Sequence, residues 1–115
     1  MRKITQDAIK ALYENKNFKR SNTEVKVFDK SVELLLHGNP IAVIEYGKLF
    51  IRHAGYPTNT TKERLNGLPN VHIQQKNWRW FLNGEEWTTG GSWTKVEDWP
   101  HCKHAVKTLD KLGFN

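Results

Sequence analysis

The chain has 115 residues, a length that fits a single domain spanning residues 1–115 and leaves little room for a second one. Hydrophobic residues make up 37% and charged residues 26%, which excludes a chain that is disordered by composition. The formal charge of +6 and the isoelectric point of about 9.6 exclude an acidic mimic of nucleic acid and favour a polyanionic partner.

A helix is predicted at the start of the chain, because apolar side chains recur there at helical spacing. They are Ile4, Ala8, Ile9, Leu12 and Tyr13, and the predicted helix ends near residues 15–17. A meander of four strands follows, over residues 24–28, 32–36, 41–46 and 49–53. The connections between these strands are so short that they can only join neighbouring antiparallel strands.

A short middle helix is predicted after the loop at residues 55–59, because residues 60–63 read Thr-Thr-Lys-Glu. In this capping box the Thr60 hydroxyl caps the helix and the Glu63 carboxylate reaches back to the backbone of Thr60. Gly67 stands where a helix commonly ends in a left-handed residue. A helix of about two turns is marginal alone, so it must pack on the sheet.

Further strands are predicted over residues 71–75, 78–82, 85–88 and 92–96. Asn83-Gly84 is the strongest hairpin signal in the chain, since both residue types tolerate a positive φ. A C-terminal helix is predicted to open at residues 98–100 and to end at Gly113. Its apolar stripe consists of Cys102, Ala105, Val106, Leu109 and Leu112.

These elements predict an α+β domain. Its sheet is expected to be mainly antiparallel, built from a meander plus hairpins. An N-terminal helix, a short middle helix and a C-terminal helix flank and interrupt the strands.

Tryptophans and cations on the later strands form the first candidate site. Trp78 and Trp80 are two residues apart on a predicted strand, so they are expected to share a face. With cations beside them, such rings can stack unpaired bases while the cations hold phosphates. The cations are Lys76, Arg79 and Lys95. The alternative is that the tryptophans fill the core, which is the commoner fate of a Trp side chain.

The start of the middle helix forms the second candidate site. Backbone N–H groups at a helix start, with hydroxyls and cations nearby, suit a phosphate. The residues concerned are Thr60, Thr61, Lys62 and Arg64. Arg64 could instead enter a groove and meet a guanine edge. The alternative is that Thr60 only caps the helix and that the cations only solvate it.

Metal and enzyme chemistry find little support in the sequence. His101 and His104 could share a helix face, but Cys102 points away from them and no CxxC or HExxH motif is present. Neither a GxSxG motif nor a phosphate-binding glycine loop occurs. The neighbouring carboxylates at residues 85–86 and 97–98 are interpreted as solvated turn residues. We therefore expect a non-enzymatic protein without a cofactor, a metal or a small-molecule substrate.

The single cysteine allows no intrachain disulfide, which favours a reducing compartment. No apolar run approaches the roughly 20 residues that a membrane span needs. The basic residues at the start of the chain are not followed by the apolar stretch of a signal peptide. We therefore expect a cytoplasmic protein without a membrane partner.

Four segments of the chain resemble small accessory proteins encoded by tailed bacteriophages. They read Ser-Asn-Thr-Glu-Val at residues 21–25, Leu-His-Gly-Asn-Pro-Ile-Ala at 36–42, Thr-Thr-Lys-Glu-Arg-Leu-Asn-Gly-Leu at 60–68, and Leu-Asn-Gly-Glu-Glu-Trp at 82–87. The resemblance implies the cytoplasm of an infected bacterium, where small proteins of this kind bind nucleic acid or inhibit a host protein. It implies no particular activity and assigns no functional residue.

Two functions therefore stand beside each other. The positive charge and the tryptophans near cations favour a nucleic-acid-binding protein. The sequence does not distinguish DNA from RNA, or a single strand from a duplex, as its ligand. The alternative is a protein-binding modulator or inhibitor of a host enzyme or defence complex, because Trp, Tyr and Arg are the usual hot-spot residues of protein interfaces.

Overall fold

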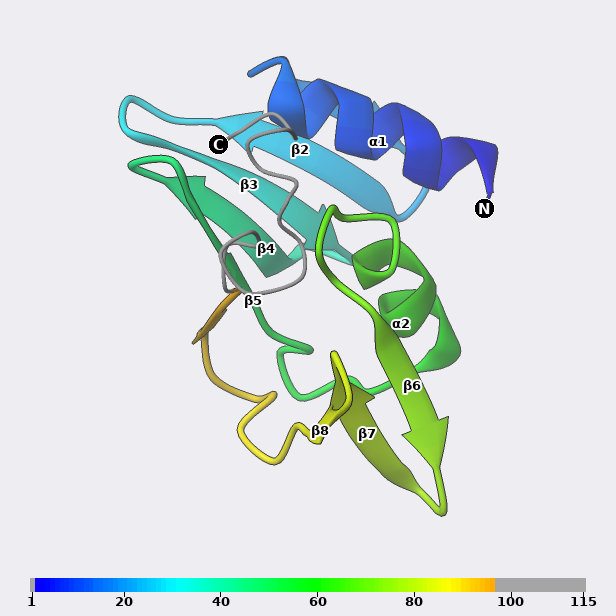
Figure 1. Cartoon of the computed structure of the whole chain (residues 1–115). Helices are drawn as coiled ribbons and strands as arrows, with labels where there is room; N and C mark the ends of the chain where they lie inside the picture. The colour runs from blue at the N-terminus through cyan, green and yellow to red at the C-terminus, as the bar shows by residue number, and fades with distance from the viewer. Residues whose placement is uncertain (1, 97–115) are drawn as a thin grey trace.

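The computed structural model describes residues 2–96, which form an α+β arrangement of two helices and two antiparallel sheets (Figure 1). The helices are α1 (Lys3–Tyr13) and α2 (Asn59–Leu65). The larger sheet has the strand order β1-β2-β3-β4-β5-β9. Its strands are β1 (Phe18–Arg20), β2 (Thr23–Val27), β3 (Ser31–Leu36), β4 (Asn39–Glu45), β5 (Lys48–Ile51) and β9 (Thr94–Lys95). The smaller sheet consists of β6 (Ile73–Lys76), β7 (Arg79–Leu82) and β8 (Glu85–Glu86).

Helix α1 forms where the apolar spacing predicted it, and it packs on the first strands of the larger sheet (Figure 1). Ala8 and Leu12, one turn apart, are buried in the core. On the polar side, Arg20 of β1 and Lys3 both pair with Asp7. Hydrogen bonds from Arg20 and then Lys3 lower the pKa of the Asp7 carboxyl. These ion pairs are exposed to solvent, so the apolar face holds the helix in place.

A row of buried side chains crosses the larger sheet and forms the centre of the core. The strand register places Val25 opposite Leu34, Leu34 opposite Ala42, and Ala42 opposite Ile51. All four side chains are at most 1% exposed. A register shift of one residue would turn an entire strand's apolar set toward solvent, so this row fixes the pairing. The predicted antiparallel meander is confirmed.

The two edge strands of this sheet differ from the prediction. β1 pairs with β2, although no strand was predicted at residues 18–20. β9 is shorter than the predicted strand at 92–96, and it pairs with β5, where Lys95 lies opposite Phe50. An edge strand can form through backbone hydrogen bonds to its neighbour, and the side-chain pattern of such a short segment carries little signal.

Helix α2 lies between the two sheets and packs against β4 and β6 (Figure 1). Leu65 of α2, Ile73 of β6 and Trp80 of β7 are buried in the same cluster as Leu34 of the larger sheet. One continuous core therefore supports both sheets.

The predicted C-terminal helix, with its His101, Cys102 and His104, lies outside the described residues. Within residues 2–96, no helix is long and apolar enough to cross a membrane. The same residues contain no cluster of three or more His, Cys, Asp or Glu side chains arranged to hold a metal ion.

Candidate nucleic-acid interface

The β6–β7 hairpin projects from the rest of the fold and ends in a tight two-residue loop (Figure 1). Lys76 and Arg79 are the last paired residues, and Asn77 and Trp78 form the loop with φ values of 53° and 68°. Two successive positive φ values are the mark of a type I′ turn, which matches the twist of the two strands. The Trp78 side chain is 93% exposed at the tip.

Trp78 occupies a position where three other hairpin loops of residues 2–96 have glycine. Three further two-residue loops have a positive φ at both residues, and their second residues are Gly38, Gly47 and Gly84. A residue with a Cβ pays roughly 1–2 kcal/mol for a left-handed backbone, and glycine does not. Neither backbone preference nor burial explains a tryptophan at this position, so we treat Trp78 as the centre of the candidate site.

Trp80 is buried, and the prediction that it shares an open face with Trp78 is wrong. Its side chain is 8% exposed and packs against His53 and Trp87, with ring centroids 5.7 and 6.2 Å away. The difference arises because the turn lies at Asn77-Trp78, one residue later than predicted. Trp78 is therefore a loop residue, whereas Trp80 is a strand residue that faces the core.

The other tryptophans of residues 2–96 are less exposed than Trp78. Trp87 is 7% exposed, and its indole N–H donates a hydrogen bond to the Thr94 hydroxyl at 3.0 Å. Trp93 is partly exposed, but the Arg52 guanidinium lies 4.5 Å from its ring centroid. Trp78 is thus by far the most exposed tryptophan in this part of the chain.

Two cations flank the tip on the outer face of the hairpin. Lys76 and Arg79 lie opposite each other and are exposed, as is Gln74, one pleat further along that face. The Arg79 Nε lies 3.8 Å from a carboxylate oxygen of Glu86 on β8. This contact is long and solvent-exposed, so it restrains Arg79 only weakly. Lys76, Trp78 and Arg79 are therefore brought together at one end of the molecule.

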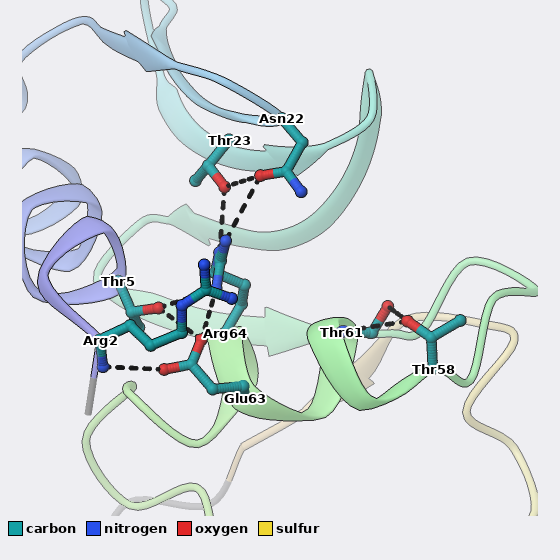
Figure 2. Close-up of polar contacts among 8 residues, drawn as sticks. All are labelled: Arg2, Thr5, Asn22, Thr23, Thr58, Thr61, Glu63 and Arg64. Carbon is teal, nitrogen blue, oxygen red and sulfur yellow. Dashed lines mark hydrogen bonds and ion pairs between the residues drawn. The ribbon is translucent and has the colours of Figure 1, made fainter.

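The predicted capping box of the middle helix is wrong. The N-cap is Thr58, whose hydroxyl accepts a hydrogen bond from the Thr61 N–H at 3.2 Å (Figure 2). The Thr61 side chain is 1% exposed and donates its own hydroxyl proton to the Tyr56 carbonyl at 2.8 Å. Thr60 lies inside the helix, and Glu63 points toward α1. Of the two hydroxyls expected to meet a phosphate, that of Thr61 is used within the fold.

Arg64 is buried, so the prediction that it meets a phosphate or a guanine edge is wrong. Its side chain is 1% exposed, and its guanidinium donates to the Thr23 and Thr5 hydroxyls, both at 3.0 Å (Figure 2). It also contacts Asn22 and the Glu63 carboxylate. These bonds join α2 to α1 and to the β1–β2 turn. Arg64 is therefore not available to enter a groove or bind a phosphate.

Glu63, whose side chain is partly exposed, completes the network around Arg64. One carboxylate oxygen accepts from the Thr5 hydroxyl and from Arg64, and the other accepts from the Arg2 backbone N–H at 3.2 Å (Figure 2). Burial by itself raises the pKa of Glu63, but the hydrogen bonds from Thr5, Arg2 and Arg64 outweigh it and lower the pKa. Glu63 thus stays ionised and balances the buried guanidinium.

The remaining predicted cations lie on different elements. The Lys62 Nζ donates to the Gln75 side chain at 3.1 Å and so lies beside β6, next to the hairpin. Lys95 belongs to β9 of the larger sheet. The structure therefore divides the predicted site into a hairpin group, a buried helix group and a separate edge strand.

His53 forms a cluster with the two buried tryptophans that the sequence did not reveal. Its ring meets Trp80 and Trp87 edge-on, with centroids 5.7 and 5.8 Å away, and its Nδ1 accepts from the Gly55 N–H at 3.1 Å. A Cβ on Gly90 would lie 2.5 Å from the His53 ring, so only glycine fits there. No local motif signals this cluster, because its members come from three separate segments.

Burial lowers the pKa of His53 below its ordinary value of 6.5. The unfolded chain then binds the proton more readily than the folded one. The contribution of neutral His53 to the free energy of unfolding is fully present above pH 6.5. It is lost as the pH falls through the lowered pKa that His53 has in the folded protein. Urea unfolding at pH 7.5 and at lower pH should show this loss, and His53→Gln should remove it. The exposed His72→Gln serves as the control, and an unchanged pH dependence in His53→Gln would contradict the assignment.

Comparison with known protein families gives a match. The family model described as Kyanoviridae Gp96 protein matches residues 1–101, which is most of the chain. Neither the curated proteins nor the solved structures contain a match. The family description states no activity, so the function has to be argued from the site.

Proposed function

The chain belongs to the Kyanoviridae Gp96 family of bacteriophage proteins, and from the geometry of its site we propose that it is a non-enzymatic accessory protein that binds nucleic acid in the infected bacterial cytoplasm. The observation that carries the proposal is the 93% exposed ring of Trp78, set between Lys76 and Arg79 at the tip of the β6–β7 hairpin. An open aromatic ring stacks on a base, and the neighbouring cations hold phosphates.

The charge distribution supports this proposal. Residues 97–115 contain three Lys or Arg and three Asp or Glu, so the formal charge of +6 lies entirely in residues 2–96. Excess positive charge on a small fold raises the local concentration of a polyanion and speeds its encounter. Lys62 adds a cation beside β6 through its bond to Gln75, on the face of the hairpin opposite to Lys76 and Arg79.

Trp78→Ala is expected to weaken binding of a fluorescein-labelled oligonucleotide by about 5-fold to 150-fold, which corresponds to the 1–3 kcal/mol of one stacked base. Fluorescence anisotropy at low salt measures this change. Thermal melting should be unaltered, because the side chain buries almost nothing.

Tyr46→Ala is the matched control for this experiment. Tyr46 is also an exposed aromatic residue, 74% accessible, in a two-residue hairpin loop with positive φ. Its loop joins β4 to β5 and lies on the other sheet. The control should bind as the unaltered protein does. Equal losses in both variants, or no binding at tens of micromolar protein in low salt, would count against the proposal.

The second candidate function is a protein-binding modulator of a host enzyme or defence complex. Trp and Arg are common anchors of protein interfaces. The exposed Glu86 carboxylate beside Arg79 repels phosphates but is compatible with a protein partner. A pull-down from nuclease-treated bacterial lysate, compared with Trp78→Ala, separates the two. A specific partner that is lost with Trp78, together with no oligonucleotide binding, would favour this second function.

A further inference from the structure

We infer, building on the proposed function, that the β6–β7 hairpin recognises an unpaired base. Its ligand class is then a single strand, or a duplex with a bulged or flipped nucleotide, and not a fully paired duplex. Three features of the hairpin lead to this conclusion: the isolation of the Trp78 ring, the position of Glu86, and the support beneath the tip.

The first feature is that one open ring stands alone at the tip. Trp80 and Trp87 are buried, and Arg52 lies over the ring of Trp93. A base inside a duplex has both faces covered by its neighbours in the stack. Trp78 can therefore stack only on a base whose face is free, or on one that has left the duplex.

The second feature is the acidic strand beside the hairpin. Glu86 of β8 lies opposite Phe81, on the same outer face as Arg79 and Lys76. A duplex lying along this face, as a two-stranded ribbon in a major groove requires, would bring its phosphates against the Glu86 carboxylate. Favourable contact is thus confined to the tip, a footprint suited to one nucleotide and its flanking phosphates.

The third feature is that the tip is organised before any ligand arrives. The loop contains only Asn77 and Trp78, and both strands pair up to Lys76 and Arg79. Behind the tip, Trp80 is packed in the core. The backbone of such a loop need not be ordered on binding, so the entropy cost of stacking is confined mainly to the Trp78 side chain.

Three fluorescein-labelled probes of one sequence test this inference: a fully paired duplex, the same duplex with one bulged adenosine, and the single strand. We expect the bulged duplex and the single strand to bind about tenfold or more tightly than the paired duplex, as one added base stack allows. Trp78→Ala should abolish the difference between bulged and paired duplex. Tyr46→Ala should preserve it, and Lys76→Ala should weaken binding of all three probes together.

The outcomes separate this inference from the proposed function. If no probe binds at low salt, the proposed function fails and the inference fails with it. If all probes bind equally, or if the paired duplex binds best, nucleic-acid binding stands and the unpaired-base inference is overturned. A preference for the bulge that persists in Trp78→Ala would also overturn it, because the recognition would then reside elsewhere. Thermal melting of each variant confirms that it is folded.

Discussion

Arg64→Ala is expected to lower the free energy of unfolding by about 2–4 kcal/mol, because it breaks a buried network in which a hydrogen bond to a charged group is worth about 1.5–3 kcal/mol. Arg64 is 1% exposed, and its guanidinium bonds to Thr5, Thr23, Asn22 and Glu63. Its removal leaves the Glu63 carboxylate without its counterion and two buried hydroxyls without a donor. Urea denaturation followed by tryptophan fluorescence at pH 7 measures the loss.

Two further variants of α2 sharpen the test of this network. Lys62→Ala removes a cation two residues away that is only partly buried and bonds to a single side chain, so its effect should stay near 0.5 kcal/mol. Arg64→Lys keeps the charge but cannot reach the Thr23 and Thr5 hydroxyls together, so it should also destabilise. A free energy of unfolding for Arg64→Ala within 1 kcal/mol of the unaltered protein would contradict the buried network.

Trp80→Ala is expected to destabilise the fold by about 3–5 kcal/mol, whereas Trp78→Ala should change stability by less than about 0.5 kcal/mol. The two residues stand two positions apart, but their side chains are 8% and 93% exposed. Removal of the Trp80 indole leaves a cavity beside His53 and Trp87, and removal of the Trp78 indole leaves none. The same urea titrations measure both changes.

The more conservative Trp80→Phe keeps an aromatic ring in the cavity, so it should lose less stability than Trp80→Ala. It provides a folded protein for binding assays if the alanine variant is unfolded. Its affinity for the oligonucleotide should match that of the unaltered protein. Weakened binding by a stable Trp80→Phe would mean that Trp80, and not Trp78 alone, contacts the ligand.

The candidate site could be predicted from the sequence only in part. The alternation of aromatic and cationic residues predicts Lys76, Trp78 and Arg79 as binding residues. The structure brings these three together at the hairpin tip. The same pattern predicts Trp80 as a binding residue, but its side chain faces the core. The pattern could not separate the two, because the turn falls one residue later than predicted and moves Trp78 out of the strand.

The burial of Thr61 and Arg64 at the start of α2 could not be predicted for a different reason. Several residues before α2 can act as a cap, and the local sequence does not distinguish Thr58 from Thr60. Arg64 reads as a surface cation on a short helix. The hydroxyls that bury it, those of Thr23 and Thr5, lie 41 and 59 residues away in the chain. No local signal announces partners at that separation.

The sequence by itself determined the elements whose causes are local. The apolar spacing of residues 4–13 specifies α1, the Asn83-Gly84 pair specifies the β7–β8 turn, and the short connections specify an antiparallel meander. Only the tertiary structure decided which polar and aromatic side chains are open to a partner. Burial depends on the packing of distant segments, and that packing encloses Arg64 and Trp80 while it leaves Trp78 exposed at the hairpin tip.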